Sequence, residues 1–304
     1  MYKIAIVIPY FGTWPSWTPL FLDSCRRNST VDFFVFTDCD PQGLDTGDYP
    51  NIHVQRASFI DYCDEAGRKL GVDFHPTRAY KLCDLRPFYG VVHGDLLKGY
   101  DFWGFCDVDL VLGDLRSFFT EEVLSRYDIL SNHSDRVSGH FSLVRNTKEI
   151  NEMSLSIADY QSMLSSDRHF AMDEIAFTRK TYPAAAFLWK VHKRVFFKLP
   201  FKDEFKSYVK FCTLFNKLML PRRLQFQERF TTPWFTKENA ADREMVERAQ
   251  WEYHEGHVRD LQNGQELPYI HFLSLKKYWP SDCYTITGHC SHVIISLKGF
   301  RRVD

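Results

Sequence analysis

Residues 102–109 read Phe-Trp-Gly-Phe-Cys-Asp-Val-Asp, a short apolar run followed at once by two carboxylates. The run Phe102–Cys106 is typical of a strand that is buried on both faces of a parallel sheet. In an open α/β sheet, ligands bind beyond the carboxyl ends of the strands, where Asp107 and Asp109 would emerge. We therefore expect this acidic pair to mark a functional site at the end of a central strand.

Other strands and helices are predicted around this run. Buried strands are expected at 3–9 and 32–37, a short strand at 51–55, and helices at 19–28, 58–70 and 77–97, the last with a break at Pro87. A further strand is expected at 138–145. The alternation of strands and helices predicts an α/β fold with a mostly parallel sheet covered by helices on both faces.

The composition excludes several classes of protein. The 304 residues are 44% hydrophobic and 25% charged, which is typical of a globular protein, and the net charge of −1 gives no indication of nucleic-acid binding. No apolar run approaches the roughly 20 residues of a membrane-spanning helix, and the first residues look like a strand rather than a secretion signal. Eight cysteines without a CxxC pair favour a reduced, cytoplasmic protein.

Charge is distributed unevenly along the chain. Residues 1–189 hold 18 Lys and Arg against 26 Asp and Glu, whereas 190–229 is strongly basic and rich in aromatic residues. Within it Phe201, Phe205, Tyr208, Phe211 and Phe215 recur at helical steps between lysines. Such a segment could lie on anionic lipid headgroups, or it could pack its aromatic side on the protein with the lysines in water. Both interpretations remain open at this point.

The Asp-x-Asp pair suits a divalent cation. Two carboxylates one residue apart offer hard oxygen ligands, which favour Mg²⁺ or Mn²⁺ over Zn²⁺. A solvated acidic turn is the simpler alternative. A haloacid-dehalogenase-type phosphatase would also use such a pair, with Asp107 as nucleophile and Asp109 as acid, but it would need a Thr where this chain has Val111.

Three stretches carry a resemblance to a known family. Ile-Val-Ile-Pro-Tyr-Phe at 6–11, Phe-Thr-Asp at 36–38 and Gly-Phe-Cys-Asp-Val-Asp-Leu-Val-Leu-Gly-Asp-Leu at 104–115 resemble GT-A-type (Rossmann-like) glycosyltransferases. More narrowly, residues 1–180 resemble bacterial GT-A-like enzymes found with capsule and O-antigen synthesis. The resemblance implies a UDP-sugar donor, with Mn²⁺ or Mg²⁺ held between Asp107, Asp109 and the diphosphate.

A later motif extends the resemblance. His271 and the run Lys276-Lys277-Tyr278-Trp279 are similar to the His…Lys-Pro-Trp ending of glycogenin and bacterial lipooligosaccharide galactosyltransferases. That similarity implies His271 as a third metal ligand and Lys276 as a contact to the diphosphate. The chain departs from the pattern at Lys277-Tyr278 and lacks the usual Gly, so Lys277 remains the alternative to Lys276. A core histidine beside surface lysines is the structural alternative.

The resemblance also implies roles for residues elsewhere. The implied donor-binding residues are Pro9, Tyr10, Phe11, Asp38, Lys81 and Arg86. For Asp38 the alternative is an Asx turn, and for Lys81 and Arg86 a surface ion pair with Asp84. Gly139 and His140 are implied at the acceptor.

A pair of acids, Asp173 and Glu174, resembles the acidic element that follows the acceptor strand in this class. In an inverting enzyme either would accept the proton of the attacking hydroxyl, and in a retaining enzyme it would orient the sugar or stabilise the transition state. The alternative is an acidic first turn of a helix.

These observations predict a metal-dependent glycosyltransferase that moves a hexose, with galactose as one candidate, to a glycan or lipid-linked acceptor. Three parts are expected: a nucleotide-sugar-binding core at 1–190, a helical basic aromatic segment at 191–240 and a part completing the active site at 241–304. A cytoplasmic protein touching the inner membrane face through 190–229 is expected. The phosphatase and a non-catalytic carbohydrate-binding relative remain the alternatives.

Overall fold

The computed structural model describes residues 1–40, 49–195, 204–233, 248–279 and 291–303. The chain forms two compact units and passes between them several times. Unit 1 holds residues 1–9, 57–106 and 124–228, and unit 2 holds 10–56, 107–123 and 229–304. The three consecutive parts expected from the sequence therefore differ from these units, and they remain a proposal about how functions are divided along the chain.

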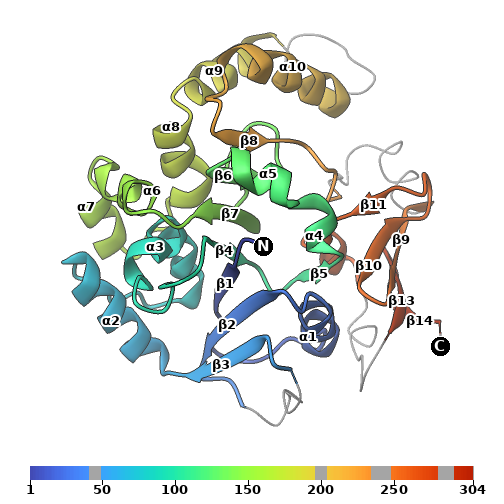
Figure 1. Ribbon diagram of the computed structural model, residues 1–304, viewed down its shortest axis with the longest axis horizontal. Coiled ribbons are helices and arrows are strands. Elements are labelled where there is room, and N and C mark those ends of the chain that lie inside the picture. The colour runs from blue at the N-terminus through green and yellow to red at the C-terminus, as the bar shows by residue number, and fades with distance from the viewer. Residues whose placement is uncertain (41–48, 196–203, 234–247, 280–290, 304) are drawn as a thin grey trace. The chain divides into compact units, whose positions relative to one another are not determined.

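Five neighbouring strands of unit 1 are hydrogen-bonded side by side (Figure 1). In spatial order its strands are β1 (Ile4–Pro9), β4 (Phe102–Cys106), β7 (Phe141–Arg145), β6 (Ile129–Ser131) and β8 (Leu224–Phe226). β1 pairs with β4 and β6 with β8 in parallel, whereas β7 runs antiparallel to both of its neighbours. All five residues of β4 are buried, as expected for a central strand.

The helices of unit 1 follow the order α2 (Phe59–Leu70), η2 (Ala79–Phe88), α3 (Tyr89–Val92), α6 (Lys148–Glu152), η3 (Met153–Ser156), α7 (Tyr160–Ser165), η4 (Met172–Phe177), α8 (Thr178–Thr181), α9 (Ala185–Val195) and α10 (Glu204–Met219). Ser58 caps α2, because its hydroxyl accepts a 3.0 Å hydrogen bond from the Asp61 amide. The predicted helix at 77–97 is a 3-10 helix that contains Pro87, followed by the short helix α3.

Unit 2 contains α1 (Thr18–Arg27) and the parallel pair β2 (Val31–Thr37) and β3 (Ile52–Arg56). β5 (Leu110–Leu112) pairs antiparallel with β12 (Tyr269–His271), and α4 (Leu115–Phe118) and η6 (Leu275–Lys277) complete this part. The short helix α5 (Glu121–Arg126) lies where the chain leaves unit 2. The α/β class and the parallel strand pairs predicted from the sequence are confirmed.

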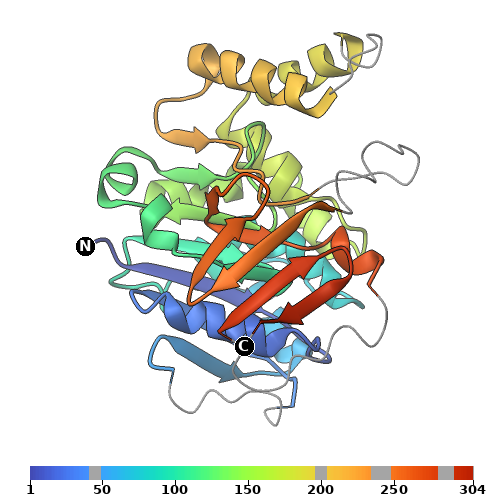
Figure 2. The ribbon, with the colours of Figure 1, turned by 90° about the vertical axis from the view of Figure 1, so that its right-hand side faces the viewer.

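A second sheet in unit 2 was not anticipated from the sequence. It is antiparallel and has the order β11 (Glu266–Leu267), β10 (His257–Asp260), β9 (Gln250–His254), β13 (His292–Ser296) and β14 (Gly299–Arg302), the orange and red arrows of Figure 2. Its strands alternate: Trp251, Tyr253, Val258 and Val293 lie in one apolar cluster, while residues between them face outward.

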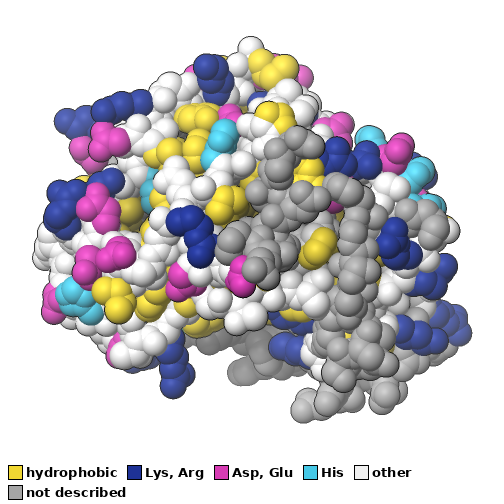
Figure 3. All heavy atoms as spheres, turned by 90° about the horizontal axis from the view of Figure 1, so that it is seen from below, with side chains coloured by type: hydrophobic (Ala, Val, Ile, Leu, Met, Phe, Trp, Pro, Cys, Tyr) yellow, Lys and Arg dark blue, Asp and Glu magenta, His cyan; other side chains and the backbone are white. Residues whose placement is uncertain are grey.

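The surface carries charge of both signs. On the face shown in Figure 3, basic and acidic side chains lie interspersed, with hydrophobic side chains between them. No helix in the described ranges has the length and apolar composition needed to span a membrane.

Gly104, in the middle of β4, permits close packing inside unit 1. A Cβ there would lie 2.6 Å from the Ser142 carbonyl oxygen and 2.8 Å from Ile6 Cδ1. We expect Gly104→Ala to lower the free energy of unfolding by about 1–3 kcal/mol, because neither the backbone of β7 nor β1 can move freely. Urea denaturation measures this change. Gly94→Ala is the control, since its Cβ would approach no atom closer than 3.4 Å, and equal losses in both variants would contradict the packing argument.

Candidate functional site

Three potential metal ligands gather in unit 2. One ligand atom from each of Asp107, Asp109 and His271 can be chosen so that all lie within 4.8 Å of one another. His271 Nε2 is 3.5 Å from Asp109 Oδ1 and 4.0 Å from Asp107 Oδ2. Asp109 and His271 are buried, and Asp107 is half-buried. Residues far apart in the sequence therefore meet as the resemblance implied.

Strand pairing brings these residues together. His271 lies opposite Leu110 in the β5–β12 pair, and the Phe272 amide donates to the Asp109 carbonyl at 3.2 Å. On the other side, Trp17 Nε1 donates to the Val108 carbonyl at 3.0 Å, which holds the backbone between the two aspartates. The Asp-Val-Asp turn is thus fixed from α1 and from β12.

A threonine that the sequence analysis did not identify orients the imidazole. Thr232 Oγ1 lies 3.1 Å from His271 Nδ1, and Thr232 is buried. When Nδ1 carries the proton and donates it to this hydroxyl, the lone pair of Nε2 faces the carboxylates, the orientation that a metal-binding histidine needs. Nothing in the local sequence distinguishes Thr232, because its partner is 39 residues away along the chain.

Lys276 is the lysine that reaches this cluster. Its Nζ lies 2.6 Å from Asp109 Oδ2 and 5.5 Å from the centre of the Trp17 ring, whereas Lys277 is exposed. Burial by itself raises the pKa of Asp109, but His271 and Lys276 outweigh burial and hold that pKa well below its ordinary value. Asp109 is therefore a carboxylate at neutral pH, with a cationic side chain beside it.

The donor set fits a divalent cation. Ligand atoms at roughly 2.1 Å from Mg²⁺ or a similar ion lie roughly 3–4 Å from one another, which is the spacing of the oxygens and Nε2 here. Two carboxylates and one imidazole suit Mn²⁺ and Mg²⁺. Within the described ranges this is the one group of three such ligands that comes together.

The residues implied at the donor end lie close along the chain. Pro9 ends β1, and Tyr10 and Phe11 follow it at the start of unit 2. Tyr10 stacks on Trp14 with ring centres 5.0 Å apart, and burial together with nearby negative charge, Asp109 included, raises the pKa of Tyr10. Tyr10 therefore lies within electrostatic reach of the metal-ligand cluster.

Asp38 ties two loops of unit 2 together. Its Oδ1 accepts a 2.8 Å hydrogen bond from the Gly12 amide, and Gly12 has a φ of +108°. Only glycine adopts that backbone conformation without strain. Asp38 thus fixes the turn that carries Tyr10 and Phe11, and a contact to a nucleotide remains a proposal.

Lys81 has a different environment from the one implied. It is buried, and its Nζ donates to Asp84 Oδ2, to the Met163 carbonyl and to the Arg168 carbonyl at 2.6–2.9 Å. Asp84 in turn accepts from the amides of Phe170 and Met172. The three ammonium protons are all used, so Lys81 and Asp84 hold the segment before η4 in place, and we do not retain Lys81 as a donor contact.

In unit 1 the acid pair occupies one turn of π-helix. η4 begins after Ala171, whose φ is +50°, and it carries Asp173 buried and Glu174 half-buried. π-helical turns are rare and occur frequently at functional sites. A Cβ on Gly139 would lie 2.9 Å from Asp173 Oδ2, so the glycine allows the loop before β7 to approach the acids.

Two arginines hold the acids. Arg86 Nη1 donates to the Gly139 carbonyl and to Asp173 Oδ2 at 3.2 Å, so this residue lies at the acid pair. Arg136, which sequence analysis did not identify, lies between Asp135 and Glu174, with Nε 3.5 Å from Glu174 Oε2. Burial of Asp173 raises its pKa to about 6, even though Arg86 acts in the opposite direction. Such a carboxylate is suited to accept a proton near neutral pH.

His140 is close to Gly139 but takes part in a different set of contacts. It is buried, its ring lies within hydrogen-bonding distance of Ser138 Oγ, and it packs against His133 with ring centres 5.1 Å apart. These contacts describe a histidine that supports the loop, and its role toward an acceptor remains a proposal.

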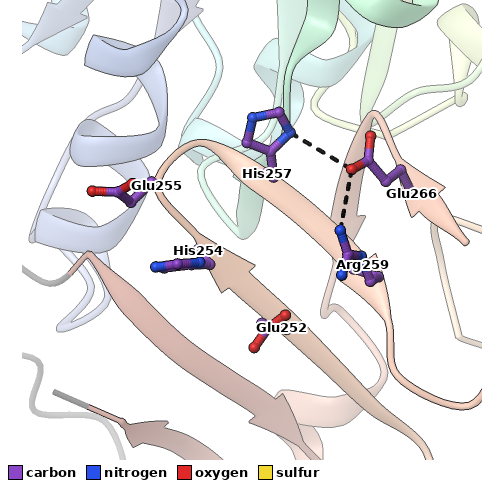
Figure 4. Close-up of a pocket in the computed structure, with 6 residues that line it drawn as sticks. All are labelled: Glu252, His254, Glu255, His257, Arg259 and Glu266. Carbon is purple, nitrogen blue, oxygen red and sulfur yellow. Dashed lines mark hydrogen bonds and ion pairs between the residues drawn. The ribbon is translucent and has the colours of Figure 1, made fainter. Parts of the chain in front are cut away.

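A separate hollow of about 240 Å³ lies over the antiparallel sheet of unit 2 (Figure 4). Within the lining, Glu266 is 3.8 Å from His257 and 3.5 Å from Arg259, and Glu252 is 2.8 Å from His292, which lies outside the lining. Glu252, His254 and Glu255 complete the lining. In the figure His257 and Arg259 point toward Glu266, and the lining as a whole holds three glutamates and one arginine.

Comparison with known proteins identifies the family. A family model described as "Family of unknown function (DUF6625)" matches residues 6–302. The chain belongs to this family. A search of curated proteins finds no match for this DUF6625 member.

Two solved structures show remote likeness to the DUF6625 chain. The galactosyltransferase LgtC, in complex with donor and acceptor sugar analogs, shares 10% identity at a TM-score of 0.31, covering 57% of this chain and 71% of that chain. The glycosyltransferase GlyE of Streptococcus pneumoniae TIGR4 shares 15% at a TM-score of 0.33, covering 77% of this chain and 56% of that chain. Likeness at these scores carries no argument, and the function must be inferred from the site itself.

Proposed function

We propose that the protein is a metal-dependent glycosyltransferase of the GT-A type, moving a hexose from a UDP-sugar to a glycan or lipid-linked acceptor. Galactose is the sugar to test first, and bacterial capsule or O-antigen synthesis is the proposed setting. The observation that carries the proposal is the cluster of Asp107, Asp109 and His271 with Lys276 beside it. Two carboxylates and an imidazole that can hold a cation, with one ammonium group beside them, suit a diphosphate bound through that cation.

Each residue of the cluster has a proposed task. Asp107, Asp109 and His271 would hold Mn²⁺ or Mg²⁺, and Thr232 keeps Nε2 of His271 directed at the site. When bound, the ion supplies Lewis-acid stabilisation of the charge on a departing nucleoside diphosphate. Lys276 supplies a second positive charge for the same group, from the 2.6 Å contact that it makes with Asp109.

Asp173 and Glu174 are the proposed acid–base residues. A buried carboxylate with a pKa of about 6 accepts a proton from a positioned hydroxyl more readily than an exposed one. In this proposal Asp173 is the first choice as proton acceptor, and Arg86 positions it. In a retaining reaction the same carboxylate would orient the sugar.

Calorimetric titration with UDP, with and without Mn²⁺, tests the proposal. A transferase of this kind binds UDP only when the cation is present. A phosphatase that used Asp107 as nucleophile would show no preference for UDP with Mn²⁺, and a non-catalytic relative would bind sugar without nucleotide. Product analysis by NMR with a panel of UDP-sugars would then identify the donor and the anomeric outcome.

Paired lysine variants sharpen the same test. We expect Lys276→Met to weaken Mn²⁺-dependent UDP binding by about tenfold or more, because a charge-assisted contact of about 1.5–3 kcal/mol is lost. Lys277→Met is the matched control, since its side chain is exposed next in the sequence. Equal effects of the two variants on UDP binding would remove Lys276 from the site.

A further inference from the structure

The pair of helices α9 and α10, at the top of Figure 1, exposes an unusual number of apolar side chains. Phe187 on α9 is 58% exposed, and on α10 Leu214 is 63%, Leu218 78% and Met219 53% exposed. Isolated exposed hydrophobic residues are common, but a group on two neighbouring helices indicates a contact surface.

Basic residues share this face. Along α10 the exposed residues Lys210, Leu214, Lys217 and Leu218 are spaced four, three and one apart, which places them on one side of the helix. Lys190 on α9 and Arg222 after α10 are also exposed, whereas the exposed Arg223 is already paired with Asp128. The sequence from Tyr208 to Arg223 contains two lysines, two arginines and no acidic residue. A partner for this face should therefore be anionic and able to accept apolar side chains.

The opposite side of α10 is held by hydrogen bonds to other residues of unit 1. Tyr208 Oη donates to Asp135 Oδ2, and Asn216 Nδ2 donates to the Ser134 carbonyl at 2.6 Å. Tyr182 donates to Asn216 Oδ1 at 3.0 Å, and Cys212 is fully buried. Because one side of the helix is anchored by these contacts, the apolar basic side is the one left for a partner.

We propose that the face formed by Lys210, Leu214, Lys217 and Leu218 of α10, together with Phe187 and Lys190 of α9, docks on an anionic lipid surface. Apolar tips enter the boundary between headgroups and acyl chains, while lysine stems keep their charges among the headgroups. Each such cation contributes about 1 kcal/mol near an anionic membrane. A protein partner would offer acidic side chains in a fixed pattern, whereas a lipid surface meets mixed apolar and basic tips without one.

The docking face is also connected to the acid pair. Asp135, which accepts from Tyr208, forms an ion pair with Arg136, and Arg136 in turn lies 3.5 Å from Glu174 Oε2. One further step rests on the proposed function: docking would place lipid-linked acceptors near the loop that carries Gly139. The docking itself does not depend on the chemistry.

Sedimentation with vesicles tests the docking. The full chain is mixed with vesicles of phosphatidylcholine alone or with phosphatidylglycerol added, at low and high NaCl, without nucleotide or acceptor. We expect binding to the anionic vesicles alone, weakening as salt rises. The double variants Lys210→Gln/Lys217→Gln and Leu214→Ser/Leu218→Ser should each weaken binding by about tenfold or more.

Matched controls are Lys98→Gln and Ile60→Ser, whose side chains are as exposed but lie on other elements of unit 1. Equal binding to both kinds of vesicle, or equal loss in controls and test variants, would overturn the proposal. The proposal would also be overturned if the chain did not bind vesicles but formed a concentration-dependent dimer that Leu214→Ser/Leu218→Ser abolished. Because no nucleotide is present, vesicle binding can succeed or fail independently of Mn²⁺-dependent UDP binding.

Discussion

Replacing Asp109 with Asn is expected to lower glycosyl transfer by about 1,000-fold or more while the fold remains intact. Asp109 is buried and ionised, and it faces both His271 and Lys276. The amide keeps the shape of the side chain but removes the charge that would hold a cation. Turnover of the UDP-sugar and calorimetric titration with Mn²⁺ measure the two consequences.

The exposed carboxylate Asp95 provides a control for this variant. Its side chain is 78% exposed and pairs with Lys98, so Asp95→Asn should leave both turnover and Mn²⁺ binding unchanged. Circular dichroism shows whether each variant is folded. Near-normal turnover in Asp109→Asn would refute the metal site. So would a crystal soaked with manganese and nucleotide in which Asp107 and Asp109 point away from the ion.

Replacing Asp173 with Asn is expected to reduce turnover by about 100- to 10,000-fold, the range typical of a lost general base. In the wild-type protein the rate should rise with pH through about 6, the pKa to which burial raises Asp173. The pH dependence of kcat/KM measures this. Glu174→Gln separates the two acids, because Glu174 is more exposed and contacts Arg136 rather than Arg86. A larger loss in Glu174→Gln would transfer the role to Glu174.

Asp173→Asn, which should lower activity, is expected to become more stable relative to wild type as pH rises. The folded-state pKa of Asp173 is raised from 3.8 to about 6, so the folded protein favours the protonated side chain. The stability this gives is complete below the unfolded-state pKa and is lost as pH rises through about 6. Asn mimics the protonated form at every pH. The free energy of unfolding of Asp173→Asn, taken relative to that of wild type, should therefore increase by about 2–3 kcal/mol between about pH 4 and pH 7. Urea denaturation of both proteins at both pH values measures this change. The same difference in free energy between variant and wild type at the two pH values would contradict the burial argument.

Local patterns were sufficient for much of the α/β framework. The runs that became β1 and β4 are continuous apolar stretches, β2 holds four apolar residues in a row at 33–36, and the capping serine of α2 is a local signal. The Asp-x-Asp pair was recognised for the same reason, since it follows β4 directly. The antiparallel sheet of unit 2 was missed because its strands are short and separated by turns, with only two to five residues each.

Pairings between distant residues could not be predicted from local patterns. The choice of Lys276 over Lys277 depends on a contact spanning 167 residues, and the orientation of His271 depends on Thr232. Lys81 was expected to bind the donor, but its ammonium group has three acceptors in the protein, two of them carbonyls more than 80 residues away. Side-chain type fixes what a residue can donate or accept, but not which partner reaches it.

For this protein, the order of residues alone determined the buried strands, the acidic pair after Cys106 and the basic aromatic character of 190–229, because these depend on neighbours along the chain. Only the tertiary structure decided that His271 and Lys276 join Asp109, that Arg86 and Arg136 hold the acids of η4, and that α10 exposes one side. The physical reason is that a charge or a lone pair acts over a few ångströms in space, however far apart its partners lie in the sequence.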